Sequence, residues 1–330
     1  MPEDHPTTGA GDDVAVGLLP PTGWLRATHA DRTGWLDDVG AAGIDHVAVG
    51  DHVSFLVGAG SDGLIDAATL LASNPTLAVH TAAYLLPLRH PVLVARQLAT
   101  IAELAPGRLI FGVGVGGEDR HEIEVCGVDP ARRGRRMDES LVALRGLLAG
   151  RATTTAGPEL ELRDALVLPA PDPPVPFLIA GRSRAATRRA GRFGDGWLGL
   201  WVSARRFGDA VAEVTEDAAA AGRYPSTFRH SLNVWCAFDD DRSSARHRLE
   251  EAMGSLYHLP LERFERWSPF GSPGEVAAFL APYVEAGCST FNLIAQGRSR
   301  RAVIDGVAEV RAALGGSPSA EAHPVRHPAV

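Results

Sequence analysis

Short apolar runs alternate with stretches of helical spacing along most of this 330-residue chain. Strands are expected at about residues 14–19, 44–49, 75–86, 108–113, 175–180, 196–200, 228–238 and 290–295. Helices are expected at about 27–42, 64–73, 91–104, 132–148, 183–193, 204–221, 242–256, 273–286 and 300–314. This alternation predicts a parallel α/β domain, and about eight units predict a (β/α)8 barrel. A doubly wound open sheet is the alternative.

No shift in composition divides the chain, so residues 13–315 are expected to form a single barrel domain. The ends, 1–12 and 316–330, are rich in Pro, Gly, Ala and His and are expected to be mobile tails. Two insertions into the barrel are expected, a hairpin at about 151–168 and a variable region at about 222–272.

The segment from Ala105 to Gly117 tests the two α/β architectures against each other. The expected strand at 108–113 is followed by several glycines. Three of them, Gly112, Gly114 and Gly117, have the G-x-G-x-x-G spacing of a dinucleotide-binding turn. That turn requires a helix to begin at its last glycine, where the helix N-terminus meets a pyrophosphate. Here a long polar connection follows, and clear helical spacing resumes only near Ala131. The pattern favours a loop at the carboxyl end of a barrel strand.

Charge and cysteine content exclude several partners and chemistries. The formal net charge of −8 argues against a nucleic-acid surface. No apolar run approaches the ~18 residues of a membrane span, and the acidic N-terminus lacks an apolar secretory segment, so a cytoplasmic location is expected. The three cysteines are too far apart for a disulfide framework or a zinc site. All 32 basic residues are arginine, which excludes a lysine Schiff base and a P-loop lysine.

Asp51 and His52 directly follow the second expected strand. In a barrel this is the catalytic face, where a histidine can exchange a proton near neutral pH and an adjacent carboxylate can orient it or contact a ligand. The structural alternative is an aspartate that caps the next segment and a histidine that packs in the core.

A second candidate site lies between the strand at 175–180 and the helix that follows. Gly181 lets the backbone approach a ligand closely, and Ser183 is a good N-cap for a helix whose first amides attract anions. Ala180, Arg182 and Arg184 flank them, and the arginines add donors for phosphate. The alternative is a capped helix with a solvated basic face.

Small residues at Thr81, Ala82 and Ala83 in the third strand would let a flat ring approach the backbone, or would simply pack tightly. The stretch His121 to Cys126 superficially resembles a metal cluster. It lacks an H-E-x-x-H pattern and a second cluster at zinc spacing, so no metal site is expected.

Three stretches together resemble the luciferase-like monooxygenase superfamily of flavin- and deazaflavin-dependent (β/α)8 barrels. They are Ile44 to His52, the block from Thr81 to Gly117 with Pro87-Leu-Arg-His-Pro91, and Ile179 to Ser183 with Ala190 to Trp197. The resemblance covers about residues 14–314.

The resemblance implies a bulge in the third strand near Thr81 to Ala83, often with a non-prolyl cis peptide, that backs the cofactor ring. It places the cofactor phosphate at the amides of Gly181, Arg182 and Ser183. Gly114, Gly116 and Gly117 are assigned to the same cofactor site.

The pair Asp51 and His52 is similar to that of members dependent on the deazaflavin cofactor F420, where the histidine lies near the hydride-transfer carbon. Some of those members carry a catalytic glutamate directly after the glycine that matches Gly116. Here Gly117 occupies that place and Glu118 follows, so Glu118 is the shifted candidate for the acid.

Three functions follow from the resemblance: F420-dependent hydride transfer to or from a small organic substrate, an FMN-dependent monooxygenase, and a flavin-binding barrel without turnover. The first is preferred because of the Asp-His pair, and a homodimer is expected. Region 222–272 gives no indication of the substrate.

Overall fold

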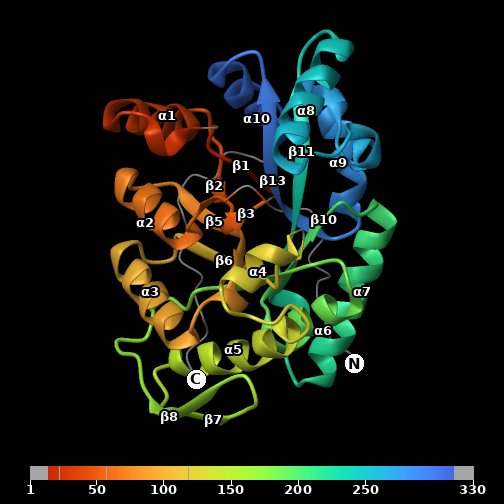
Figure 1. The fold of residues 1–330 in the computed structure, drawn as a ribbon. Helices are drawn as coiled ribbons and strands as arrows, with labels where there is room; N and C mark the ends of the chain where they lie inside the picture. The colour runs from red at the N-terminus through yellow and green to blue at the C-terminus, as the bar shows by residue number, and fades with distance from the viewer. Residues whose placement is uncertain (1–13, 22, 57, 118, 316–330) are drawn as a thin grey trace, which may run out of the picture.

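The computed structural model describes residues 14–315 except 22, 57 and 118. Within them, eight parallel strands form a closed barrel (Figure 1): β1 (Ala15–Leu18), β2 (His46–Val49), β5 (Ala78–Leu85), β6 (Leu109–Gly114), β9 (Phe177–Ala180), β10 (Gly196–Leu200), β11 (His230–Phe238) and β13 (Cys288–Gly297). The sheet closes because β1 pairs with β2 and β13, while β11 pairs with β10 and β13. The predicted (β/α)8 barrel is confirmed. Both expected tails, 1–12 and 316–330, lie outside the described residues.

Helices cover the outside of the barrel (Figure 1): α1 (His29–Ala41), α2 (Gly63–Ser73), α3 (Pro91–Leu104), α5 (Arg133–Leu147), α6 (Arg184–Phe193), α7 (Ala204–Ala220), α8 (Arg242–Tyr257), α9 (Pro273–Glu285) and α10 (Arg300–Ala313). Most begin after a side chain that accepts a first-turn amide hydrogen, as Thr28, Asp62, Ser183, Ser203, Asp241, Ser272 and Ser299 do. No helix in the described part of the chain is both long and apolar enough to cross a membrane.

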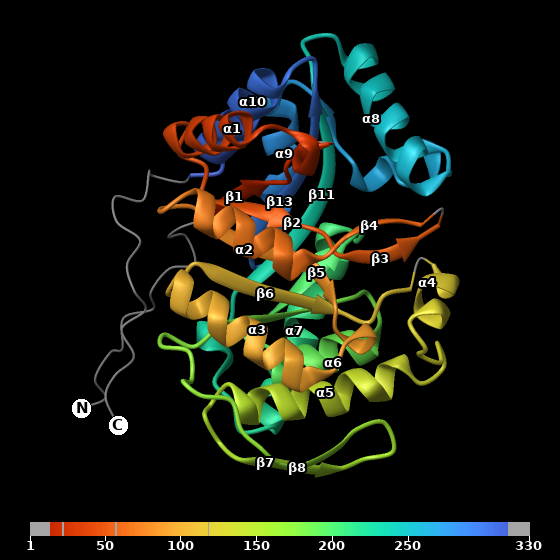
Figure 2. The ribbon, with the colours of Figure 1, turned by 60° about the vertical axis from the view of Figure 1, so that its left-hand side comes forward.

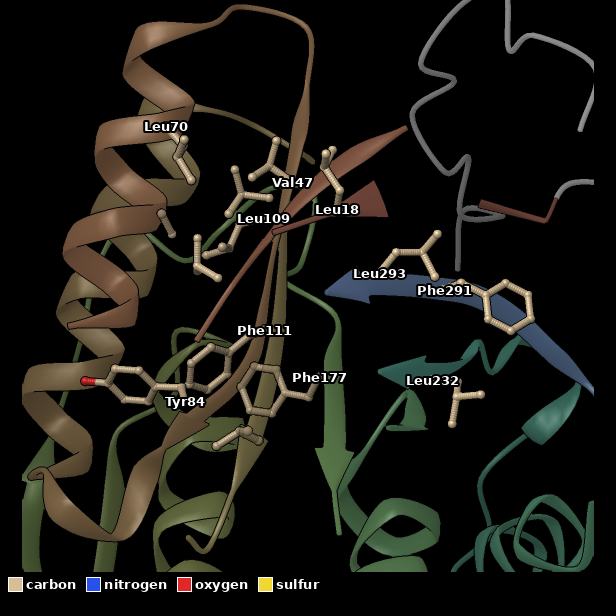
Figure 3. Close-up of a cluster of buried hydrophobic side chains, with 14 of the residues drawn as sticks. Leu18, Val47, Leu70, Tyr84, Leu109, Phe111, Phe177, Leu232, Phe291 and Leu293 are labelled. Carbon is tan, nitrogen blue, oxygen red and sulfur yellow. The ribbon is translucent and has the colours of Figure 1, made fainter. Parts of the chain in front are cut away.

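The main hydrophobic core lies between the barrel wall and the helices. Tyr84, Phe111 and Phe177 form a row across three adjacent strands, with ring centroids 5.5 and 5.3 Å apart (Figure 3). All three are almost fully buried. Burial of each such side chain stabilises the fold by about 1.5–3 kcal/mol. Because successive side chains of a strand point to opposite faces, burial of these three residues fixes which face of each strand points toward the helices.

The two expected insertions have different outcomes. The first is a hairpin of β7 (Thr153–Ala156) and β8 (Glu161–Ala165), as predicted. The second range, 222–272, contains the barrel strand β11 and the helix α8, so it is not an insertion as a whole. Only the segment after α8 is additional, with 3-10 turns at Leu261–Arg263 and Glu265–Trp267 and the short strand β12 (Phe270–Gly271) beside β11.

Two further elements at the carboxyl end of the barrel strands were not predicted: a hairpin of β3 (His52–Phe55) and β4 (Ala59–Ser61), and the short helix α4 (Arg120–Val125). Figure 2 shows α4 beside the hairpin. The expectation of an unbroken polar connection up to Ala131 was therefore wrong. Asp119 caps α4 by accepting the His121 amide hydrogen at 2.9 Å, and six residues are too few to show helical spacing.

Candidate functional site

Three small residues from adjacent strands meet at the carboxyl end of the barrel. A Cβ added to Gly114 would lie 3.5 Å from Cβ of Ala180 and 3.6 Å from Cβ of Ala83. The register of β5 against β6 shifts between Thr81 and Tyr84, which confirms the predicted bulge, and the Ala82–Ala83 peptide bond is cis. These positions leave a flat backbone surface that has no bulky side chain.

Thr81 does not contribute its side chain to that surface. It is fully buried, and its hydroxyl donates to the carbonyl oxygen of Gly112 at 2.8 Å. Ala82 and Ala83 are half-buried and remain accessible. Of the three candidates in this strand, the two alanines therefore line the surface and Thr81 braces the neighbouring strand.

A chain of hydrogen bonds crosses the barrel interior beneath this surface. Oδ1 of Asn292 lies 2.6 Å from Nε2 of His46 and 3.1 Å from Nδ1 of His80. The Asn292 amide group donates to Oδ1 of Asn233 at 2.8 Å, and Asn233 donates to the carbonyl oxygen of Ala82 at 2.9 Å. Four strands are thus tied by polar side chains, and the chain ends on the backbone at the bulge.

The two histidines in this chain are neutral. Burial lowers the pKa of His80 to about 3, and it also lowers the pKa of His46. Because Asn292 offers its oxygen to both rings, each donates from the nitrogen that faces it. Space for the His46 ring depends on Gly17, where an added Cβ would lie 2.4 Å from the imidazole.

His52 pairs with Glu122 of α4. Nδ1 of His52 lies 3.0 Å from Oε2 of Glu122, and the His52 side chain is 34% exposed while Glu122 is 3% exposed. Glu122 also accepts the amide hydrogens of Val53 at 2.7 Å and Ser54 at 3.1 Å. An acceptor at Nδ1 places the neutral ring's proton there and leaves Nε2 free to accept a proton.

Asp51 faces a different partner. Its buried carboxylate binds both ends of the Arg89 guanidinium, at 2.6 and 2.8 Å, and accepts the amide hydrogens of Gly63 at 2.9 Å and Leu85 at 2.8 Å. Burial acts to lower the pKa of Arg89, but the Asp51 carboxylate raises it, so the guanidinium stays charged. Asp51 thus fixes the end of β5 and the start of α2. The residue that orients His52 is Glu122 and not Asp51.

The loop before α6 has the predicted glycine turn and helix cap. Gly181 has a φ of 133°, and a Cβ there would come within 2.9 Å of Ala186. Ser183 caps α6 through the Ala186 amide, at 3.3 Å. Arg182 is exposed, and its guanidinium carbon lies 5.8 Å from the ring centroid of Trp201, the residue that follows β10. Glycine, helix N-terminus and arginine are therefore neighbours in this loop.

Arg184 does not join this group. Its guanidinium pairs with the Asp217 carboxylate of α7, with one N–O distance of 3.0 Å, and Glu213 also lies nearby. Arg184 therefore joins α6 to α7, and its contact with a phosphate stays a prediction.

A hollow of about 220 Å³ opens beside His52. It is lined by Gly50, Asp51, His52, Phe55, Ala59, Gly60, Ser61, Asp66 and Leu256. The hairpin β3–β4 and the end of α8 supply most of this wall, so elements beyond the regular barrel shape it.

Of the glycines assigned to a cofactor, Gly116 packs near Leu85 and Ile123, while Gly117 is exposed near Arg133. Glu118 lies outside the described residues. Within the described residues, no group of three or more His, Cys, Asp or Glu side chains converges as a metal site.

Sequence reasoning missed Arg89, Glu122, Asn233 and Asn292. Arg89 stands inside the motif Pro87-Leu-Arg-His-Pro91 that carried the resemblance, and Glu122 inside the stretch considered for metal binding. The two asparagines interrupt apolar strands, and a polar residue in such a strand is the signal that could have found them.

Comparisons with known proteins agree with this architecture. An F420-dependent glucose-6-phosphate dehydrogenase of Kineococcus radiotolerans is 28% identical over 78% of this chain and 85% of its own length. The structure of an F420-dependent secondary alcohol dehydrogenase in complex with an F420-acetone adduct matches with a TM-score of 0.80 at 21% identity, over 92% of this chain and 99% of the other. EDTA monooxygenase from Chelativorans sp. BNC1 matches with a TM-score of 0.71 at 16% identity, over 93% and 99%.

The two structural matches show a shared fold. A family model described as luciferase-like monooxygenase matches residues 39–275, which span the hairpin β3–β4, the small-residue surface and the Gly181 loop. The chain belongs to the luciferase-like monooxygenase family.

Proposed function

We propose that the protein is an F420-dependent oxidoreductase that transfers hydride to or from a small organic substrate. The observation that carries this proposal is the pair His52 and Glu122, which holds a histidine with a free Nε2 at the edge of a hollow. The names of the curated relatives, F420-dependent glucose-6-phosphate dehydrogenase and F420-dependent hydroxymycolic acid dehydrogenase, support the choice of cofactor.

The residues present fit such a cofactor. Ala83, Gly114 and Ala180 leave room for a flat ring against the backbone, and the Gly181 loop offers amides, a helix N-terminus and Arg182 to a phosphate. Bound F420 would supply the carbon that carries hydride.

His52 would hold or release the proton that accompanies hydride transfer. Its Nδ1 faces Glu122, so Nε2 would accept the proton when an alcohol is oxidised and return it when a carbonyl is reduced. Glu122 would stabilise the imidazolium formed in the first case. Asp51 would keep the loop before His52 in place through Arg89 and the Leu85 amide.

Paired titrations of the apoprotein with F420 and FMN, followed by intrinsic fluorescence, test the proposal. Tight binding of F420 with FMN orders of magnitude weaker is the expected result. The reverse preference would favour a monooxygenase that uses FMN and oxygen, and binding of neither would refute both. Cofactor binding with no turnover after broad substrate testing would favour the flavin-binding barrel.

Three further expectations belong to this proposal. The protein would form a homodimer, and light scattering tests this expectation. The protein would reside in the cytoplasm, and Glu118 would be a second candidate for the catalytic acid. Glu118→Gln with unchanged turnover would remove that residue from the proposed mechanism.

A further inference from the structure

We propose that the substrate is a neutral organic alcohol or ketone with an apolar body, held against an aromatic cluster above the barrel, and not an anionic sugar phosphate. This inference rests on the proposed function. The aromatic cluster consists of Phe55, Trp201, Trp235, Tyr257 and Phe264.

The charges around the hollow disfavour an anion. Among the described residues, those that line it include the carboxylates of Asp51 and Asp66 and no arginine. The guanidinium of Arg89 lies behind Asp51 and is engaged with both Asp51 and Asp62. A phosphate dianion entering beside His52 would therefore meet carboxylates that repel it.

The apolar wall of the hollow continues directly into the aromatic cluster. Phe55 lines the hollow and stacks on His52 with ring centroids 4.1 Å apart, and it meets Tyr257 edge-on at 6.5 Å. Leu256, the residue before Tyr257, lines the same hollow. A substrate that places its reacting carbon beside His52 would thus lie against aromatic and aliphatic side chains.

Tyr257 is the centre of the cluster. Its ring centroid lies 5.3 Å from Trp201, 5.9 Å from Trp235 and 5.9 Å from Phe264. Trp201 directly follows β10, Trp235 lies within β11, and Tyr257 and Phe264 come from the end of α8 and the turn after it. The segment that differs most from a plain barrel therefore builds part of the cluster behind the wall. Apolar walls with a few polar groups are what small neutral ligands select.

The reaction balances without another reactant. In the oxidation, the carbinol C–H bond would break, and F420, when bound, would supply the two-electron acceptor for the hydride. Nε2 of His52 would take the hydroxyl proton as the C–O bond becomes a carbonyl. The reduction of a ketone is the reverse.

The test uses F420-loaded protein and two neutral probes, 1-phenylethanol and cyclohexanol, with glucose 6-phosphate as the anionic comparison. F420 reduction is followed by absorbance, and binding of acetophenone to the loaded protein is measured separately by calorimetry. We expect kcat/KM for 1-phenylethanol to exceed that for glucose 6-phosphate by about 100-fold.

Two variants probe the cluster. Phe55→Leu removes the aromatic ring that lines the hollow, and it should raise KM for 1-phenylethanol about 10-fold with little change in F420 affinity. Tyr257→Leu should raise the same KM by about 10-fold or more. Tyr224→Ala, a tyrosine that is 84% exposed, is the control and should change neither value. Thermal melting of each variant verifies folding.

Oxidation of glucose 6-phosphate as efficiently as 1-phenylethanol would overturn the inference and leave F420 dependence intact. So would the failure of F420-loaded protein to bind acetophenone or oxidise either neutral alcohol. A protein that does not bind F420 would instead refute the proposed function, and the substrate inference with it.

Discussion

Glu122 accepts a hydrogen bond from Nδ1 of His52 at 3.0 Å, although 70 residues of chain separate the two. The same carboxylate binds the amides of Val53 and Ser54, so it holds both the ring and the backbone that carries the ring. Because Glu122 is buried and these contacts are short, the His52 ring has one favoured tautomer and one free nitrogen.

His52→Ala should lower kcat by about 10²–10⁴-fold, because a positioned proton acceptor contributes that much to such a step. The affinity for F420, measured by fluorescence titration, should change little, since the loop and the small-residue surface stay intact. His247→Ala is the control, as that histidine is exposed on α8, where it pairs with Glu251. Unchanged turnover in His52→Ala would remove this side chain from the mechanism.

Glu122→Gln should lower kcat by about 10²-fold or more, because a glutamine N–H facing Nδ1 would favour the tautomer with the proton on Nε2. Glu122→Asp, which keeps the charge, should recover part of the activity. The pH dependence of kcat should change as well, which a purely structural role would not produce. Glu124→Gln, in an exposed pair with Arg120, is the matched control. Equal activity of Glu122→Gln and the wild type would exclude the orienting role.

Arg182→Ala should weaken cofactor binding, and the loss should be larger at low salt, where an exposed guanidinium attracts phosphate over a longer distance. Arg184→Ala is the matched control, because its charge is already paired with Asp217 on the next helix. Titrations with FMN and with riboflavin, which lacks the phosphate, separate the contribution of the phosphate to binding from that of the ring. Equal affinity for riboflavin and FMN would exclude an anion site at the Gly181 loop.

Asp51→Ala should destabilise the fold by about 3 kcal/mol, because it leaves the Arg89 guanidinium without its buried partner and two amides without an acceptor. Denaturant unfolding measures the loss. Asp305→Ala removes the carboxylate of an exposed pair with Arg301 and should cost less than about 1 kcal/mol. A cost for Asp51→Ala as small as that for Asp305→Ala would show that the buried pair contributes little.

The sequence was sufficient for the barrel and for the local geometry of motifs that are contiguous in the chain. Apolar spacing located the strands and helices, and the loop of Gly181 to Ser183 was recognisable because glycine, cap and arginine are neighbours in the chain. The bulge near Ala82 was found through resemblance, and its register shift bears this out.

Pairings between distant residues were not accessible in this way. Arg89 lies 38 residues from Asp51, and Asn233 lies 151 residues from Ala82. The residues next to a histidine in the sequence do not indicate which carboxylate it will contact in the fold. Adjacency suggested Asp51 as the partner of His52, but successive residues of an extended chain point to opposite sides, so the two side chains diverge.

The barrel interior should make the protein sensitive to acid. Burial lowers the pKa of His80 to about 3 and that of His230 to about 4, whereas both would titrate near the ordinary histidine value in the unfolded chain. At pH values between the ordinary histidine pKa and the lowered pKa, the unfolded chain binds a proton that the folded protein does not bind. The stability of the fold therefore falls as the pH falls through this range. Going from pH 7.5 to pH 5 should cost about 2 kcal/mol for each of these histidines.

Unfolding in urea at both pH values, compared between the wild type and His80→Gln, measures the contribution of His80. Glutamine keeps a donor for Asn292 and cannot titrate, so the variant should lose about 2 kcal/mol less on acidification than the wild type. His247→Gln should behave as the wild type, because an exposed histidine on α8 does not suffer the same burial. If His80→Gln loses as much stability as the wild type between pH 7.5 and 5, the acid sensitivity arises elsewhere, and the buried chain through Asn292 tolerates a charged His80.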